Sequence, residues 1–78
     1  MNLEQLIVDI AKAIVDKPEF VNVTANETDD SIVYVLNVHP DDMGLVIGKQ
    51  GKIAKAIRSV VKAVALGNNK KKVTVDIR

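Results

Sequence analysis

Two glycines, Gly48 and Gly51, constrain the fold of this 78-residue chain more than any other feature. They enclose Lys49 and Gln50, and an apolar pair precedes them. Because glycine has no Cβ, both positions permit a tight turn and a close approach of the backbone to a bulky group. A long run with apolar residues at helical spacing follows, so this glycine loop (residues 48–51) predicts a corner between two helices.

The part of the chain before the loop predicts a helix and a β-hairpin. Apolar residues recur at helical spacing from Leu3, with Asn2 as a capping-box-like start and Pro18 ending the helix near Lys17. Residues 20–25 alternate between apolar and polar side chains, as in a half-buried strand. Residues 32–38 are apolar on both faces and predict the central strand, paired antiparallel with the first.

The part after residue 38 predicts two helices and a last strand. A short helix runs roughly from Asp42 to Ile47, with Asp41 and Asp42 placed as N-cap and first turn. A longer helix begins near Gly51 and ends at Gly67. Its inward residues are predicted to be Ile53, Ile57, Val60, Val61 and Val64. Alternation of Val73, Val75 and Ile77 with polar residues predicts the final strand.

This order, αββααβ, predicts one α+β domain over residues 1–78. A right-handed crossover through the helix pair lays the last strand parallel to the central one. The expected architecture is a three-stranded mixed sheet with three helices packed on one face.

The net charge of +1 conceals an uneven distribution. Residues 1–42 hold nine acidic residues and two lysines, a net charge of −7, whereas residues 43–78 hold nine basic residues and one aspartate, a net charge of +8. Such a division predicts a positive surface on one side of the protein, which favours a polyanionic partner. A solvated, lysine-rich helix face without a partner is the alternative interpretation.

Composition also argues against several classes of protein. There is no cysteine and only one histidine, His39, so neither a disulfide framework nor a zinc site is expected, and no cofactor is predicted. No nucleophile with an acid–base pair is apparent, so the chain is not expected to be an enzyme. No signal peptide and no membrane-spanning apolar run is recognisable, so the expected location is the cytoplasm.

The glycine loop admits more than one interpretation. A nucleotide-triphosphate loop needs four residues between its glycines and a hydroxyl after the lysine, whereas Gly44 and Gly48 are separated by three residues and Gln50 follows Lys49. A plain corner between helices, without a ligand, remains open. The flanking Lys49 and Lys52, together with the N-terminus of the next helix, favour a phosphate as the ligand.

Residues 46–53, Val-Ile-Gly-Lys-Gln-Gly-Lys-Ile, resemble the signature of a KH domain. The αββααβ order resembles the type II, bacterial arrangement, and residues 40–58 resemble small stand-alone bacterial KH proteins of the KhpA type. The resemblance covers essentially the whole chain. It implies a non-enzymatic protein whose Gly-x-x-Gly loop clamps the backbone of single-stranded RNA, and a role as a post-transcriptional regulator or RNA chaperone.

The residues that this resemblance and the basic pattern assign to RNA binding surround the loop and the long helix. They are Val46, Ile47, Gly48, Lys49, Gln50, Gly51, Lys52, Ile53, Lys55, Ile57, Arg58, Lys70, Lys71 and Lys72. Val46, Ile53 and Ile57 are also candidates for the core, and the lysines for plain solvated surface. With one tyrosine, one phenylalanine and no tryptophan, strong base stacking is not expected, so modest affinity is predicted. Single-stranded DNA remains an alternative ligand.

A second function class is a protein-interaction subunit whose KH fold mediates assembly. Candidate contact surfaces are Val33 and Val35 on the second sheet face and the region of Ala63 and Ala65 on the long helix. The resemblance implies a homodimer and a heterodimer with a larger KH-containing protein of the Jag or KhpB type.

Overall fold

The computed structural model describes residues 2–68 and 71–78 and confirms the predicted order of elements. The regular elements are α1 (Leu3–Ile14), β1 (Asn22–Glu27), β2 (Ser31–Asn37), α2 (Met43–Ile47), α3 (Lys52–Asn68) and β3 (Lys72–Ile77). Short 3-10 helices cover Pro18–Phe20, Pro40–Asp42 and Lys49–Gly51.

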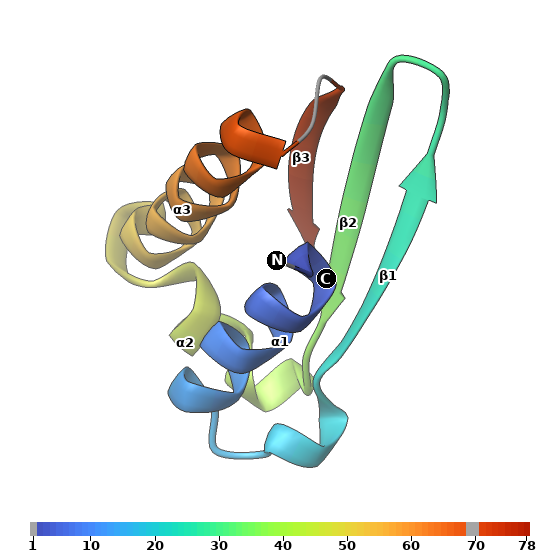
Figure 1. Ribbon diagram of the computed structural model, residues 1–78. Coiled ribbons are helices and arrows are strands. Elements are labelled where there is room, and N and C mark those ends of the chain that lie inside the picture. Colours follow the sequence, from blue (N-terminus) through green and yellow to red (C-terminus); the bar gives the residue numbers. More distant parts are fainter. Residues whose placement is uncertain (1, 69–70) are drawn as a thin grey trace.

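The sheet is mixed, with β2 in its centre, as the apolar character of that strand on both faces predicted (Figure 1). β1 pairs with β2 antiparallel and β3 pairs with β2 parallel. Tyr34 in the middle of β2 lies opposite Ala25 on one side and Val75 on the other. The predicted α+β class and three-stranded mixed sheet are therefore confirmed.

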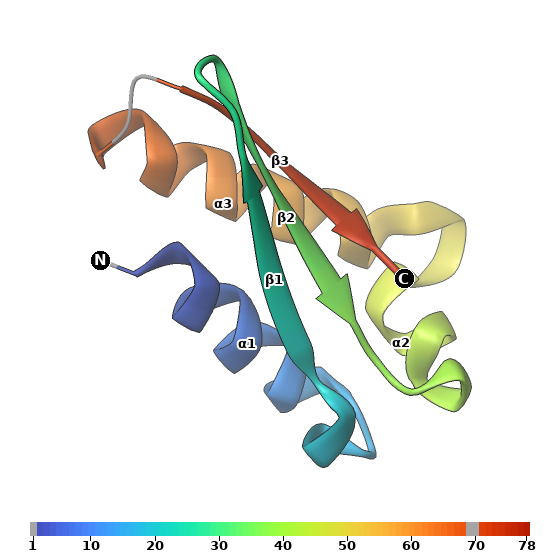
Figure 2. The same ribbon diagram turned by 90° about the vertical axis from the view of Figure 1, so that its right-hand side faces the viewer.

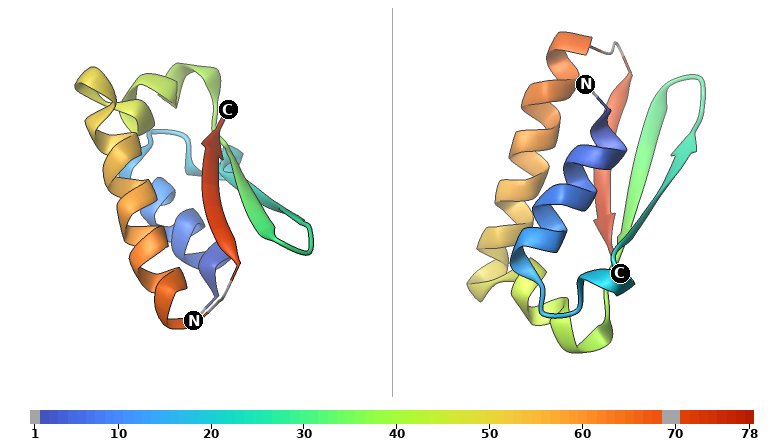
Figure 3. Two further views of the ribbon diagram at one scale, coloured as in Figure 1. Left: turned by 90° about the horizontal axis from the view of Figure 1, so that it is seen from above. Right: turned by 60° about the horizontal axis from the view of Figure 1, so that its bottom comes forward.

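One face of the sheet is covered by helices. Figures 1 and 2 show α1 and α3 on the same side of the sheet, and the right-hand view of Figure 3 shows them side by side and running in opposite directions. The five-residue α2 lies at the end of this layer and packs against both α1 and α3. Ile7, Leu36 and Val61 have no exposed surface and come from α1, β2 and α3 in turn. Burying each such side chain stabilises the fold by about 1.5–3 kcal/mol.

The first helix begins as predicted but ends earlier. The Asn2 side chain accepts a hydrogen bond from the backbone N–H of Gln5 at 3.2 Å. α1 stops at Ile14, because Val15 already has extended backbone and the next two N–H groups bond elsewhere. The predicted continuation to Lys17 is wrong.

The first strand is displaced by two residues from its prediction. Phe20 belongs to a 3-10 turn that begins at Pro18, and its ring meets the His39 ring edge-on at 4.7 Å. β1 therefore covers residues 22–27 rather than 20–25. Proline readily occupies the first position of a helical turn. Residues 18–20 therefore belong to the connection between α1 and β1, and the strand begins later.

The long helix has fewer inward residues than the apolar pattern predicted. Ile57 and Val61 are buried and Val64 is partly buried, whereas Ile53 and Val60 are 37% and 44% exposed. The inward placement of Ile53 and Val60 is therefore wrong. The alanines at 54 and 65 are buried instead, and Ala65 belongs to the core cluster that α1, the sheet and α3 form together.

Candidate nucleic-acid interface

The glycine loop forms the predicted corner between α2 and α3. Gly48 ends α2, donating its N–H to the carbonyl of Gly44 at 2.9 Å, and has φ 76° and ψ 174°. Gly51 also has positive φ, at 74°, and Gln50 between them adopts φ 57° and ψ 25°. Three positive φ angles within four residues reverse the chain so that α3 begins at Lys52.

The two glycines serve different purposes. A Cβ at Gly48 would lie 2.4 Å from Cγ1 of Ile53 and 3.0 Å from its backbone nitrogen, so close packing inside the protein requires glycine there. A Cβ at Gly51 would meet nothing within 4 Å, which means that the backbone at Gly51 faces open space. The corner alone therefore explains Gly48, whereas Gly51 leaves a stretch of backbone accessible from outside.

The fourteen residues assigned from the sequence fall into groups with different exposure. Val46 and Ile57 are 0% and 3% exposed and belong to the core, so they have almost no surface to offer a ligand. Ile47 and Ile53 remain as exposed apolar side chains beside the loop. Exposed polar positions are Lys49, Gln50, Lys52, Lys55 and Lys72, and partly exposed ones are Gly48, Gly51, Arg58 and Lys71. Lys70 lies outside the described residues.

Lys55, Arg58 and Lys62 form a row along one side of α3, which we call the basic flank. They are three and four residues apart and therefore neighbours on the helix surface. This flank faces β3, because Nε of Arg58 donates a hydrogen bond to the carbonyl oxygen of Val75 at 3.1 Å. The backbone N–H groups of Lys72 and Arg78 donate to the carbonyl oxygens of Asp30, just before β2, and Leu36, in β2. Alternate residues of a parallel strand bond to the same neighbour, so the carbonyl of Val75 lies on the free edge of β3.

The opposite side of α3 is apolar. Ile53, Ala56 and Val60, which we call the apolar flank, line a hollow of about 280 Å³ together with Ile57 and with Ile10 and Ile14 of α1. α3 thus presents three sides: a buried one toward the sheet, an apolar flank toward α1 and a basic flank toward β3.

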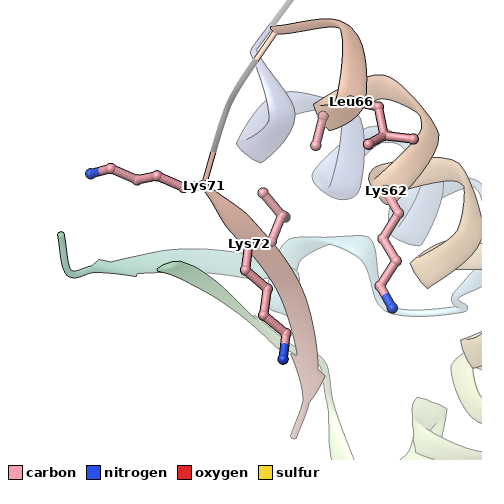
Figure 4. Close-up of a pocket in the computed structure, with 6 residues that line it drawn as sticks. Lys62, Leu66, Lys71 and Lys72 are labelled. Carbon is pink, nitrogen blue, oxygen red and sulfur yellow. The ribbon is translucent and has the colours of Figure 1, made fainter. Parts of the chain in front are cut away.

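The lysines after α3 differ in direction. The ammonium group of Lys71 bonds to the carboxylate of Glu27 and, at 3.0 Å, to the carbonyl oxygen of Thr28 in the hairpin. Figure 4 shows Lys71 pointing away from Lys62, while Lys62 and Lys72 run in the same direction from α3 and β3. Lys72, rather than Lys71, therefore extends the basic flank.

A buried carboxylate fixes the position of α2 and hence of the glycine loop. Asp42 is 2% exposed and accepts hydrogen bonds from the backbone N–H groups of Asp16, at 3.3 Å, and Lys17, at 3.0 Å. Although Asp42 occupies the predicted N-cap position of α2, its side chain makes no capping bond to that helix. A carboxylate just before a helix is typical of a cap, so the sequence held no local signal for this cross-chain role.

An exposed ion pair lies beside that carboxylate. The ammonium group of Lys17 lies 2.9 Å from the carboxylate of Asp41. The hydrogen bond to Lys17 lowers the pKa of Asp41, and the same bond raises the pKa of Lys17. The His39 side chain completes the turn by accepting a hydrogen bond from the Asp41 N–H at 3.0 Å.

Other kinds of site have no support in the described residues. Within residues 2–68 and 71–78, no three histidine, aspartate or glutamate side chains cluster so as to hold a metal ion. In the same part of the chain, no helix is both long and apolar enough to cross a membrane.

Comparison with known proteins gives consistent matches. The family model described as "KhpA/KhpB, KH domain" matches residues 4–77. The chain is 56% identical to the "RNA-binding protein KhpA" of Clostridium perfringens over 75 residues, covering 96% of this chain and 99% of the relative. It is 56% identical over 69 residues to the protein of that name from Listeria monocytogenes, covering 88% and 91%. No solved structure matches the chain.

Proposed function

The chain belongs to the KhpA/KhpB KH-domain family, and from that premise we propose that it binds single-stranded RNA and catalyses no reaction. In this proposal residues 1–78 act as one KH domain. Relatives more than half identical over nearly their whole length bear the name RNA-binding protein, which supports the assignment.

The observation that favours the proposal most is the open backbone at Gly51. No internal atom lies within 4 Å of its Cβ position, and Lys49 and Lys52 flank it as exposed cations. The first turn of α3 contains no acidic residue. A phosphate placed there meets the positive end of the helix dipole and two lysines.

The strand would leave the loop along the basic flank, with its bases toward the exposed Ile47 beside the loop. Neither aromatic side chain of the protein offers a stacking platform there, because Tyr34 is buried in the sheet and Phe20 packs against His39. Stacking is worth about 1–3 kcal/mol per base. Binding should therefore be modest in affinity and tolerant of sequence, which suits a post-transcriptional regulator or an RNA chaperone.

A charge reversal in the loop tests the proposal. Lys49→Asp with Gln50→Asp keeps the corner intact, because aspartate tolerates the left-handed backbone of position 50. Fluorescence polarisation with a labelled single-stranded RNA should show at least a tenfold weaker affinity. The salt dependence should also weaken by about 0.7 in log–log slope for each phosphate that the loop no longer neutralises.

The matched control is Lys12→Asp with Asn22→Asp, which changes the net charge equally at exposed positions of α1 and β1. It should bind RNA like the wild type. Equal affinity of the loop variant and the wild type would refute the clamp. Single-stranded DNA of the same sequence, measured in parallel, decides between the two nucleic acids.

A second function, assembly with another copy of the chain, is favoured by the apolar flank. The hollow between α1 and α3 is lined only by apolar side chains, and Val60 is 44% exposed within it. Each surface suggested from the sequence contains one buried residue, Val35 or Ala65, and one with exposed surface, Val33 or Ala63. We propose that the apolar flank mediates homodimerisation and that the same surface pairs with a larger KH-containing protein of the KhpB type.

Sedimentation of the wild type and of Val60→Glu tests the dimer. The wild type should sediment as a dimer at micromolar concentration and the variant as a monomer, because a charge on the apolar flank resists burial. Ala25→Glu, at an exposed position of β1 that does not line the hollow, is the control. A wild type that stays monomeric across this range would exclude the dimer.

A further inference from the structure

The end of α3 and the beginning of β3 enclose a hollow that the RNA-binding loop does not use. Its volume is about 270 Å³, just below the range for drug-sized ligand pockets. The residues that line it are Lys62, Ala65, Leu66, Lys71, Lys72 and Val73. Ala65 and Val73 form a buried apolar floor, and Leu66 stands beside it with 86% of its surface exposed.

The charges around this hollow are of one sign. Figure 4 shows Lys62 on α3 and Lys72 on β3 extending in parallel on either side of it. Lys71 contributes only its stem, because its ammonium group bonds to Glu27 and Thr28. Among the described residues, no acidic side chain lines the hollow. An apolar floor between two lysines fits a ligand with a flat apolar body and a negative charge, which describes a nucleotide.

The position of the hollow connects it to the glycine loop. Lys52 stands at the start of α3, and the basic flank continues from there to Lys62 at the edge of the hollow. These ten residues span about 15 Å at 1.5 Å per residue. Along this path Lys55 and Arg58 supply further positive charge, so a single strand held at the loop can follow one continuous positive track to the hollow.

We propose that this hollow is a second contact for the same RNA strand and receives a nucleotide beyond the four that a Gly-x-x-Gly loop clamps. The base lies on the floor beside Leu66 and the phosphate lies between the ammonium groups of Lys62 and Lys72. The inference rests on the proposed RNA-binding function and extends it. The protein then has a footprint longer than four nucleotides.

Length dependence tests this second contact. Affinities for four- and ten-nucleotide oligouridylates are measured by NMR titration and polarisation. A site that holds four nucleotides can bind a ten-nucleotide strand at seven positions, so the affinity for the longer strand rises about sevenfold on statistical grounds alone. We expect a gain of at least thirtyfold for the wild type. We also expect the methyl resonances of Leu66 to shift with the ten-nucleotide strand but not with the four-nucleotide strand.

Leu66→Ser should reduce the gain to the statistical value without changing the affinity for four nucleotides, and Lys62→Glu, on the basic flank, should reduce the gain as well. Lys62→Glu should also lower the salt slope for the longer strand by about 0.7. Lys12→Glu, an equal charge reversal on exposed α1, is the control. All three positions are exposed, so the variants should fold.

A wild-type gain of sevenfold or less, or an equal reduction in affinity at both lengths in Leu66→Ser, would overturn the second contact. Both results leave the loop's role intact. Failure of the loop itself is recognised separately, because Lys49→Asp with Gln50→Asp would then bind the four-nucleotide strand as tightly as the wild type does.

Discussion

Replacing Gly48 by alanine should destabilise the protein far more than the same replacement of Gly51. Both glycines have positive φ, at 76° and 74°. Only at Gly48 does the new Cβ collide with the protein, at 2.4 Å from Cγ1 of Ile53, 2.9 Å from its Cβ and 3.0 Å from its backbone nitrogen. Both variants therefore carry a backbone cost, and only Gly48→Ala adds the collision.

The magnitude follows from these two contributions. With ψ at 174°, Gly48 lies in a region that is almost exclusive to glycine, where another residue costs about 1–3 kcal/mol. Relieving the overlap with Ile53 by a local shift costs about 1–3 kcal/mol more. Gly48→Ala should thus lower the free energy of unfolding by about 2–6 kcal/mol. Gly51→Ala should lower it by about 1–2 kcal/mol, the cost of a left-handed residue.

Urea unfolding followed by circular dichroism, at one protein concentration, measures both variants against the wild type. In thermal unfolding of a domain of this size each kcal/mol lowers Tm by about 4–8 °C, so the collision of about 1–3 kcal/mol should place the Tm of Gly48→Ala about 4–24 °C below that of Gly51→Ala. Adding Ile53→Ala to Gly48→Ala removes the collision with Cγ1 and should restore about 1 kcal/mol. The remaining close approaches at 2.9 and 3.0 Å prevent full rescue. Equal destabilisation by the two alanines would refute the packing argument.

Three further predictions concern the supports of the loop. Asp42→Ala leaves the N–H groups of Asp16 and Lys17 without their acceptor and should lower the free energy of unfolding in urea by about 3 kcal/mol, and Asp42→Asn by less. Because Lys17 holds the pKa of Asp41 below its ordinary 3.8, this pair stabilises the fold above that pH and the contribution is lost as the pH falls through the lowered pKa. In Lys17→Met, NMR titration should therefore show the pKa of Asp41 returning to its ordinary range. The free energy of unfolding of this variant should also depend less on pH below pH 3.8. An unchanged pKa of Asp41 would contradict the pairing. Gln50→Gly relieves the cost of a left-handed non-glycine residue, about 1–2 kcal/mol, which stabilises the folded state. The same change gives the unfolded chain more conformational entropy, which lowers the free energy of unfolding by about 0.4–1 kcal/mol. Tm should therefore rise by a few degrees, and a fall would mean that the Gln50 side chain makes stabilising contacts.

Local pattern was enough to predict the order of the elements and the sheet. Alternation in β1 and β3, the apolar character of β2 on both faces and the helical spacing of α1 and α3 predicted the mixed sheet with β2 at its centre. The end of α1 was missed because it depends on Asp42, which bonds to Asp16 and Lys17 from 26 and 25 residues away. No local pattern can encode a bond of that sequence separation.

The candidate site was predicted in part. The corner and its glycines follow from the sequence, but the sequence treats Gly48 and Gly51 alike, and only the packing of Ile53 separates a glycine required inside from one open to the outside. Helical spacing likewise places Ile53, Ile57 and Val60 in one apolar sector. It does not say that the sheet and α1 bury Ile57 and leave Ile53 and Val60 exposed.

The three sides of α3 make RNA binding and assembly compatible in one small domain. A helix that packs one side on the sheet keeps two flanks, and here they differ in chemistry: Lys55, Arg58 and Lys62 toward β3, and Ile53, Ala56 and Val60 toward α1. A partner on the apolar flank leaves the basic flank open. If the dimer forms there, each pair of chains presents two glycine loops to one RNA, and the second loop binds as an intramolecular event. Modest affinity at each loop is then no obstacle to firm binding of a long strand.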